Sequence, residues 1–183
     1  MIIKELPLVD EILADWKNTI GDDFQGYRNH VHRMILCCFA LKSLANENLS
    51  NDEKEKIIIA GAFHDLGIWI ENTLDYLPPS IPPARNYLKK RGLESWSIEI
   101  ELMINEHHKL KEYQDSRYPL VELFRKGDLV DFSLGVVKFG LPKSDIKTLK
   151  AKFPNAGFHK CLAKRAIKWF LKHPLNPAPM MKW

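Results

Sequence analysis

Apolar residues recur along most of the chain at the three- and four-residue spacing of amphipathic helices. The spacing predicts helices over about residues 8–19, 26–45, 51–65, 84–91, 94–110, 117–132 and 157–172. The run before His64 is apolar nearly all round, so this helix should lie in the middle of the molecule. No segment shows the alternating pattern of a strand. We therefore expect an all-α fold, with residues 1–183 forming one helical domain.

Glycines and prolines indicate where the predicted helices end. Gly67 follows the helix at 51–65 and predicts its stop. The segment 77–84 reads LPPSIPPA, and its tandem prolines predict an ordered surface loop rather than a helix. Breaks at Leu141-Pro142 and at 153–155 set apart a C-terminal region, 141–183. It should hold the last helix and a Pro-rich tail that lies extended along the surface.

Composition and charge limit the class of protein. The 183 residues are 45% hydrophobic and 27% charged, which is typical of a soluble globular domain. No stretch has the character of a secretory signal or the apolar length of a membrane span, so we expect no membrane partner. The net charge of +4 would suit a small anionic substrate, but it is too weak to indicate nucleic acid.

The three cysteines show no regular spacing. Cys37 and Cys38 are neighbours, and Cys161 is far away in the sequence. This pattern predicts neither a disulfide framework nor a zinc cluster. Reduced thiols indicate a cytoplasmic location. The oligomeric state stays open, and a homo-oligomer is compatible with the sequence.

The first candidate for chemistry is the pair His64-Asp65, which ends the apolar helix. An ionised aspartate there loses its water and meets the negative end of the helix dipole. A bound cation would offset both costs. The alternative interpretation is a helix-ending aspartate that is hydrogen-bonded to a core histidine.

A second candidate is Asp128, which shares an apolar stripe with Val121, Phe124 and Phe132. The pattern predicts that its carboxylate points toward the core, where an unpaired charge would cost several kcal/mol. Asp128 therefore needs a metal ion or a basic partner. The alternative to a metal is a buried ion pair, for which Arg33 is a candidate.

Four histidines lie near these residues in the predicted helices. His107 falls at the centre of the buried side of its helix, and His108 falls at the rim of that side. His30 and His32 lie on opposite flanks of one apolar stripe, so periodicity does not choose between them. For each histidine alone, a core imidazole bonded to a carbonyl is the alternative.

The order His, His-Asp, His-His, Asp resembles the HD-domain metallohydrolase superfamily over roughly residues 25–135. The family's first histidine is typically followed three positions later by Arg, as are His30 and Arg33 in YRNHVHRM. The pair stands in AGAFHDLG, and the distal aspartate stands in RKGDLVDF, where Gly127 replaces a frequent Ala. The resemblance implies an all-helical HD fold. It also implies a divalent metal held by His30, His64, Asp65 and Asp128.

The resemblance further implies a phosphohydrolase that acts on a small phosphate ester or nucleotide. Two imidazoles and two carboxylates suit Mn, Fe, Co, Ni, Zn or Mg, with one ion expected and two allowed. Such an ion makes a nucleophilic water available near neutral pH. We expect His107 to act as general acid or substrate ligand, and Asp131 to orient a ligand or the water. The residues expected to bind the phosphate are Arg33, Lys109, Arg125 and Lys126. The residues expected to contact the rest of the substrate are Trp69 and Tyr76, as a wall or lid, and His108 at the rim.

A departure from the family pattern keeps other functions open. Nucleotidases of this type carry a Glu three residues after the pair, where this chain has Ile68. A diiron oxygenase that cleaves C–C or C–P bonds is one alternative, with His107 as an extra ligand, although residues 66–106 hold no histidine. A non-catalytic metal- or ligand-binding module is another. The turn at 153–159 also ends in a histidine, and its simplest interpretation is a hydrophobic anchor.

Overall fold

The computed structural model describes residues 5–182, and this part of the chain is all-helical, as the sequence predicts. The helices are α1 (Pro7–Ala14), α2 (Lys17–Ile20), α3 (Phe24–Leu44), α4 (Asn51–Phe63), α5 (Gly67–Ile70), α6 (Leu77–Arg91), α7 (Ser97–Glu106), α8 (Pro119–Phe132), α9 (Lys143–Lys152) and α10 (Phe158–Lys172). None of these described helices combines the length and the apolarity that crossing a membrane requires.

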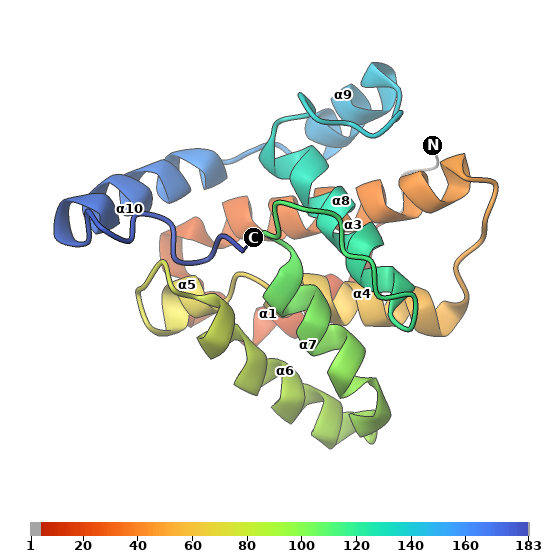
Figure 1. Ribbon diagram of the computed structural model, residues 1–183, viewed down its shortest axis with the longest axis horizontal. Helices are drawn as coiled ribbons and strands as arrows, with labels where there is room; N and C mark the ends of the chain where they lie inside the picture. Colours follow the sequence, from red (N-terminus) through yellow and green to blue (C-terminus); the bar gives the residue numbers. More distant parts are fainter. Residues whose placement is uncertain (1–4, 183) are drawn as a thin grey trace.

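Helices α3 and α8 cross at the centre of the molecule and make its most extensive helix contact (Figure 1). Gly127 of α8 packs tightly against the backbone of α3. A Cβ at this position would stand 2.2 Å from Cys38 Sγ and 2.9 Å from the Met34 carbonyl oxygen. The packing around position 127 therefore leaves no room for a side chain larger than that of glycine.

Helix α4 packs against α1, α3, α6, α7 and α8, in the central position that its apolar sequence predicts. Its start is fixed by a capping box in which Ser50 accepts from the Glu53 amide and Glu53 accepts from the Ser50 amide. Its last residue is Phe63. The helix therefore delivers His64 and Asp65 directly into the core.

The prediction of a loop at 77–84 is wrong, because this segment forms the first half of α6. Pro78 and Pro79 occupy the first turn, where backbone amides have no acceptor within the helix and their loss costs little. Pro82 and Pro83 do remove two interior hydrogen bonds. Burial of one face of the helix, which includes Leu77, stabilises α6 against that loss.

The prediction that Gly67 ends a helix is also wrong, because Gly67 begins α5. Its amide donates to Ser80 Oγ at 2.9 Å. A Cβ at Gly67 would lie 2.3 Å from the Tyr76 carbonyl oxygen. Glycine is required here because α5 approaches the start of α6 closely. The preference of glycine for helix ends does not predict such a tertiary contact.

Other boundaries differ from the pattern-based ones for local reasons. The predicted helix at 8–19 is divided into α1 and α2 around Trp16. Helix α9 went unpredicted because it buries only Ile146 and Leu149, which is too few for a periodic signal. Helix α7 ends at Glu106 rather than near residue 110, so His107 and His108 lie just beyond it.

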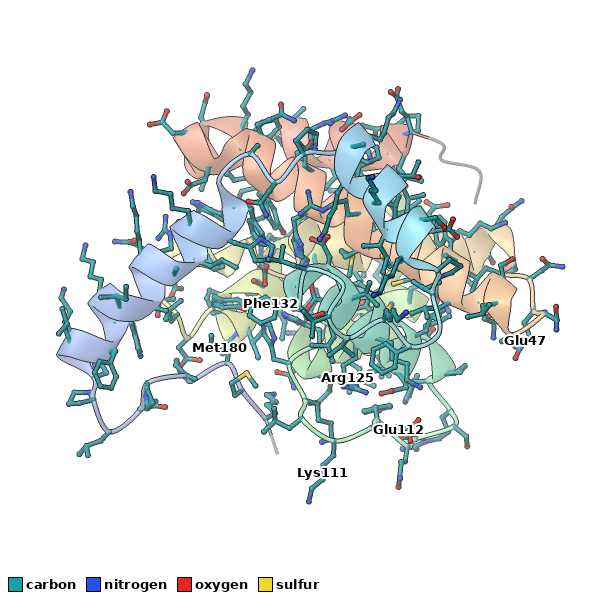
Figure 2. All side chains as sticks on the ribbon, turned by 90° about the horizontal axis from the view of Figure 1, so that it is seen from above. Glu47, Lys111, Glu112, Arg125, Phe132 and Met180 are labelled. Atoms are coloured by element: carbon teal, nitrogen blue, oxygen red, sulfur yellow. The ribbon has the colours of Figure 1, made fainter. Side chains whose placement is uncertain are left out.

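The C-terminal region covers one side of this helical core. Figure 1 shows α10 projecting away from the other helices, and Phe158 is its one fully buried side chain among the described residues. The tail then runs back to the end of α7, where the Leu110 amide donates to the Lys182 carbonyl oxygen at 2.8 Å. Met180 of this tail and Phe132 of α8, both labelled in Figure 2, line the same cavity. Trp183 lies outside the described residues.

Candidate metal centre

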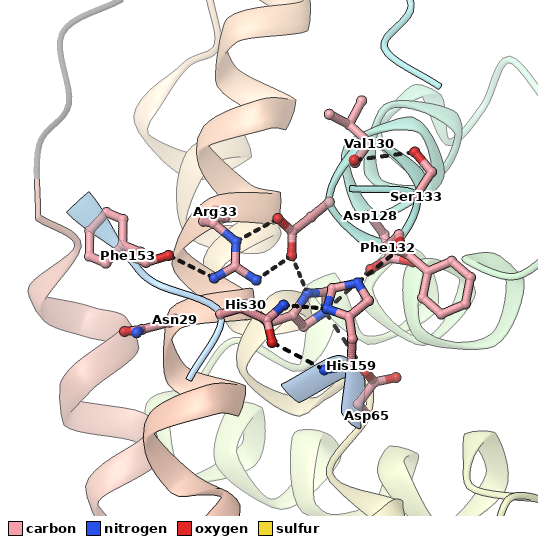
Figure 3. Close-up of polar contacts among 12 residues, drawn as sticks. Asn29, His30, Arg33, Asp65, Asp128, Val130, Phe132, Ser133, Phe153 and His159 are labelled. Atoms are coloured by element: carbon pink, nitrogen blue, oxygen red, sulfur yellow. Dashed lines mark hydrogen bonds and ion pairs between the residues drawn. The ribbon is translucent and has the colours of Figure 1, made fainter. Parts of the chain in front are cut away.

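Four buried side chains converge where α3, α8 and the end of α4 meet. They are His30, His64, Asp65 and Asp128, of which Figure 3 labels His30, Asp65 and Asp128. His30 Nε2 lies 3.2 Å from His64 Nε2 and 3.3 Å from Asp128 Oδ1. His64 Nε2 lies 3.3 Å from Asp65 Oδ2. Two further distances, His30 Nε2 to Asp65 Oδ2 and His64 Nε2 to Asp128 Oδ1, are both 3.8 Å.

These separations suit donors that share one ion. Ligand atoms about 2.0–2.2 Å from a divalent metal lie roughly 3.0–3.5 Å from one another. Three of the distances fall in this range, and the two at 3.8 Å are slightly wider. His30, His64 and Asp65 could therefore hold a metal ion, and Asp128 Oδ1 lies near both histidines of this group.

Hydrogen bonds on the far side of each imidazole orient its Nε2 into the cluster. His64 Nδ1 donates to the Gly61 carbonyl oxygen at 2.7 Å, which is a bond inside the last turn of α4. His30 Nδ1 donates to Asp131 Oδ2 at 2.8 Å. Partners of this kind fix the tautomer and the ring orientation of metal-binding histidines.

Asp131 is itself held by Arg33. The Arg33 Nε and Nη2 groups donate to the two Asp131 oxygens at 2.6 and 2.8 Å. Burial would raise the pKa of Asp131, but hydrogen bonds from His30 and Arg33 outweigh it and lower this pKa to about 2. Arg33 Nη1 donates to the Phe153 carbonyl oxygen at 2.8 Å. Arg33 therefore faces Asp131 rather than a substrate, and the alternative pairing of Arg33 with Asp128 is wrong.

The histidines of the cluster shift the pKa values of its carboxylates toward the ionised form. Burial would raise the pKa values of Asp65 and Asp128, but the neighbouring histidines lower both. Burial would likewise lower the pKa of His30, but hydrogen bonds to Asp128 and Asp131 raise it to about 9. The pKa shifts of Asp65 and Asp128 favour their ionised forms, and two carboxylates match a dication in charge.

A second group of possible ligands shares Asp65. His107 Nε2 lies 3.4 Å from Asp65 Oδ1, and neither buried atom has a hydrogen-bond partner within the described chain. His107 Nδ1 donates to the Ile104 carbonyl oxygen at 2.7 Å, which aims Nε2 at Asp65. Ligand atoms of Asp65, His107 and His108 lie within 4.8 Å of one another. The two unpaired atoms fit a cation between them.

The structure distinguishes His30 from His32. His32 is buried on the other side of α3, where its Nε2 lies 3.1 Å from Asp10 Oδ1. Its ring stacks on Phe153 with the centroids 4.6 Å apart. His30, not His32, lies in the cluster.

A cavity of about 240 Å³ opens beside the cluster, with His30, Asp65 and Asp128 at one end. Tyr76 and His108 also line it, and the Tyr76 hydroxyl donates to His108 Nε2 at 2.5 Å. Burial, with the charges of Asp65 and Asp128, raises the pKa of Tyr76 well above its usual value, so its hydroxyl keeps the proton. Burial and the nearby His107 lower the pKa of His108 to about 3.

The basic residues expected at the substrate lie away from this cavity. Arg125 donates to both Glu122 oxygens at 2.6 and 2.7 Å. Lys126 Nζ lies 3.3 Å from Glu122 Oε1 and 3.3 Å from Glu112 Oε1, and Lys109 forms an ion pair within its own turn. None of the cavity-lining residues in the described part of the chain is Lys or Arg.

Two other expected residues also lie outside the cavity. Trp69 donates from Nε1 to Asp23 Oδ2 at 3.0 Å and packs against Tyr27, so it supports the core behind the site. His107 lies behind Asp65 rather than in the cavity wall. A role as a buried ligand therefore fits His107 better than a role as general acid.

The opposite wall comes from α10 and the tail, which the sequence reasoning missed. Phe158 stacks on the His30 ring with the centroids 4.2 Å apart. His159 Nε2 donates to the Phe132 carbonyl oxygen at 3.0 Å, so this histidine anchors α10 to the end of α8. Phe158, Leu162 and Ala166 recur every four residues and line the cavity. This spacing was the signal that could have identified them.

Comparisons of the chain with protein-family models, with curated proteins and with solved structures found no match. The resemblance to the HD superfamily therefore rests on the order of the motif residues.

Proposed function

We propose that the protein is a metal-dependent phosphohydrolase of HD type that acts on a small phosphate ester. The observation that carries this proposal is the convergence of four donor atoms, from His30, His64, Asp65 and Asp128, within 3.2–3.8 Å of one another over the pairs described above. The site lies beside a cavity that can admit a small molecule. A bound divalent ion would lower the pKa of a coordinated water and polarise a phosphoryl oxygen.

The chain's own residues prepare the site for that ion. Asp131 and Arg33 keep the His30 ring in one orientation, and Phe158 covers its face. The ionised carboxylates of Asp65 and Asp128 match a dication in charge. Because these groups are already buried and oriented, binding requires little rearrangement.

Tyr76 is the residue best placed to donate a hydrogen bond to a substrate oxygen. Its hydroxyl lies in the cavity wall and retains its proton. In the structure this proton points to His108 Nε2, which is neutral at physiological pH because its pKa is about 3. A substrate oxyanion can take the place of His108 as acceptor. Tyr76 thereby stabilises negative charge without losing its proton.

The test is phosphatase activity of the metal-loaded protein, with two histidine variants as a matched pair. His30→Ala removes a donor from the cluster, whereas His32→Ala removes an equally buried imidazole two residues away. We expect the first variant to lose more than 100-fold in kcat/KM, since it lacks a metal ligand, and the second to keep the activity of the folded fraction. Circular dichroism measures that fraction. Equal losses in the two folded variants, or no phosphate ester hydrolysed at all, would contradict the proposal.

A two-metal oxygenase is the second candidate, and a specific observation favours it. The two oxygens of Asp65 face different histidine groups, with Oδ2 toward His64 and Oδ1 toward His107. A carboxylate in this position can bridge two ions. Two irons per chain, together with consumption of oxygen and no phosphatase activity, would support the oxygenase proposal and contradict the hydrolase proposal. Tight metal binding without either activity would support the interpretation that the protein is a non-catalytic metal-binding module.

A further inference from the structure

The cavity beside the metal centre is divided into a polar end and an apolar end. Acidic and imidazole groups lie where it meets the cluster. Beyond Tyr76 and His108, its walls are built from Leu74, Phe132, Phe158, Leu162, Ala166 and Met180. A ligand that reaches the cluster must therefore place the rest of its body against hydrocarbon.

The polar groups near the apolar end already have partners. His159 donates from Nε2 to the Phe132 carbonyl oxygen and accepts at Nδ1 from Asn155 Nδ2 at 2.5 Å. The Tyr76 hydroxyl donates to His108, and the proposed function assigns this donor to the phosphate rather than to the organic group. A sugar or a nucleobase placed there would lose its hydrogen bonds to water without full replacement, which disfavours its binding.

The dimensions of the cavity point to a compact ligand. Its volume of about 240 Å³ is below the range of pockets that hold drug-sized molecules, roughly 300–1,000 Å³. Ala166, on the inner face of α10, has a small side chain that leaves room at the apolar end. The absence of Lys and Arg from the described lining also removes the usual contacts for a second phosphate group.

We infer that the substrate is a small phosphate monoester whose organic group is apolar, such as a short alkyl chain or a single aromatic ring, rather than a nucleotide or a sugar phosphate. This inference rests on the proposed function for the phosphate and on the cavity wall for the organic group. The head group lies at the histidine-aspartate cluster, and the apolar group lies along α10.

The experiment is anaerobic calorimetric titration of the metal-loaded protein with unbranched alkylphosphonates of increasing chain length, which cannot be hydrolysed. Each added methylene that fits should tighten binding by up to about fourfold, until the cavity is full. Glycerol phosphate and a nucleoside monophosphate should bind more weakly than the best alkylphosphonate. Affinity that is independent of chain length, or tighter binding of the nucleoside monophosphate, would overturn the inference.

A pair of leucine variants locates the selectivity on α10. Ala166→Leu fills the apolar end and should shorten the preferred chain, whereas Lys164→Leu adds the same side chain to the exposed face and should leave the chain-length profile unchanged. Identical profiles for both variants would contradict the assignment, and melting temperatures check that both fold.

Activity assays separate this inference from the proposed function. Chain-length-dependent binding without hydrolysis of any ester would support the apolar selectivity while overturning the hydrolase. Equal hydrolysis of glycerol phosphate and alkyl phosphates would support the hydrolase while overturning the selectivity.

Discussion

The two sides of the cavity are built in different ways. The cluster side comes from α3, α4 and α8, which cross in the core and bury ionisable residues such as Asp128 and Arg33. The opposite side comes from α10 and the tail, where only Phe158 of the described α10 residues is fully buried. The first side is held by charge-assisted hydrogen bonds and dense packing, and the second by a few contacts.

This difference indicates that the two sides have different roles, one in metal binding and one in enclosing the ligand. Side chains that must stay within tenths of an ångström to bind an ion belong on packed helices. Residues that only enclose the organic part of a ligand tolerate a mobile support, and regions with few buried contacts open at low free-energy cost. We therefore expect changes at the cluster to affect metal binding and changes at α10 to affect ligand choice and local stability.

The largest effect should come from Asp128→Ala. Removing this carboxylate should abolish metal binding with little loss of helix content, because it deletes a proposed ligand and one polar contact to His30 but none of the apolar packing of α8. Asp22→Ala, which changes an exposed aspartate, is the control. Metal affinity from chelator competition and helix content from circular dichroism check the prediction. An Asp128→Ala protein that holds metal as tightly as the parent would show that the cluster is not the site.

A smaller effect is expected for Asp131→Asn, which removes the carboxylate behind His30. Loss of such a partner typically costs about 10–100-fold in metal affinity. The same competition assay should place this variant between the parent and Asp128→Ala. A loss as complete as that of Asp128→Ala would indicate that Asp131 is itself a ligand.

Gly127→Ala tests the crossing that brings α3 and α8 together. The added Cβ would clash with Cys38 Sγ at 2.2 Å, so we expect about 1–3 kcal/mol lower free energy of unfolding. Chemical denaturation measures this change. Combining the variant with Cys38→Ala should recover part of the loss, and no interaction between the two substitutions would contradict the proposed clash.

The smallest effect should come from Asp23→Asn, which loosens α10. Asp23 Oδ2 accepts from Trp69 and from Cys161 Sγ, both at 3.0 Å, and lies 3.5 Å from Arg165 Nη2. Because this carboxylate is partly exposed, its loss should cost at most about 1 kcal/mol. We expect faster hydrogen exchange in α10 and unchanged metal affinity. Unchanged exchange would show that other contacts hold this helix.

The same carboxylate predicts a pH dependence. Burial would raise the pKa of Asp23, but hydrogen bonds from Trp69 and Cys161 and the charge of Arg165 lower it below 3.8. Its contribution to stability is therefore complete above pH 3.8 and is lost as the pH falls through the lowered pKa. Protection factors in α10, which are the intrinsic exchange rates divided by the observed rates, should fall over this acidic range in the parent, and Asp23→Asn should lack that transition.

The sequence predicted the cluster side better than the α10 side for a physical reason. His64, Asp65 and Asp128 are polar residues at core positions, and periodicity detects such residues directly. The sequence does not show whether Arg33 and Arg125 bind a substrate or a carboxylate of the protein. In the structure their guanidinium groups bind Asp131 and Glu122. The helix at 77–84 was missed because packing against α5 and α7 outweighs the cost of its prolines.

The most direct test of the central claim is the metal content of freshly purified protein, measured by elemental analysis under anaerobic handling beside Asp128→Ala. We predict about one equivalent of a divalent metal per chain in the parent, or two if the group around His107 is also filled, and none in the variant. A parent protein that stays free of metal even after reconstitution would contradict the account.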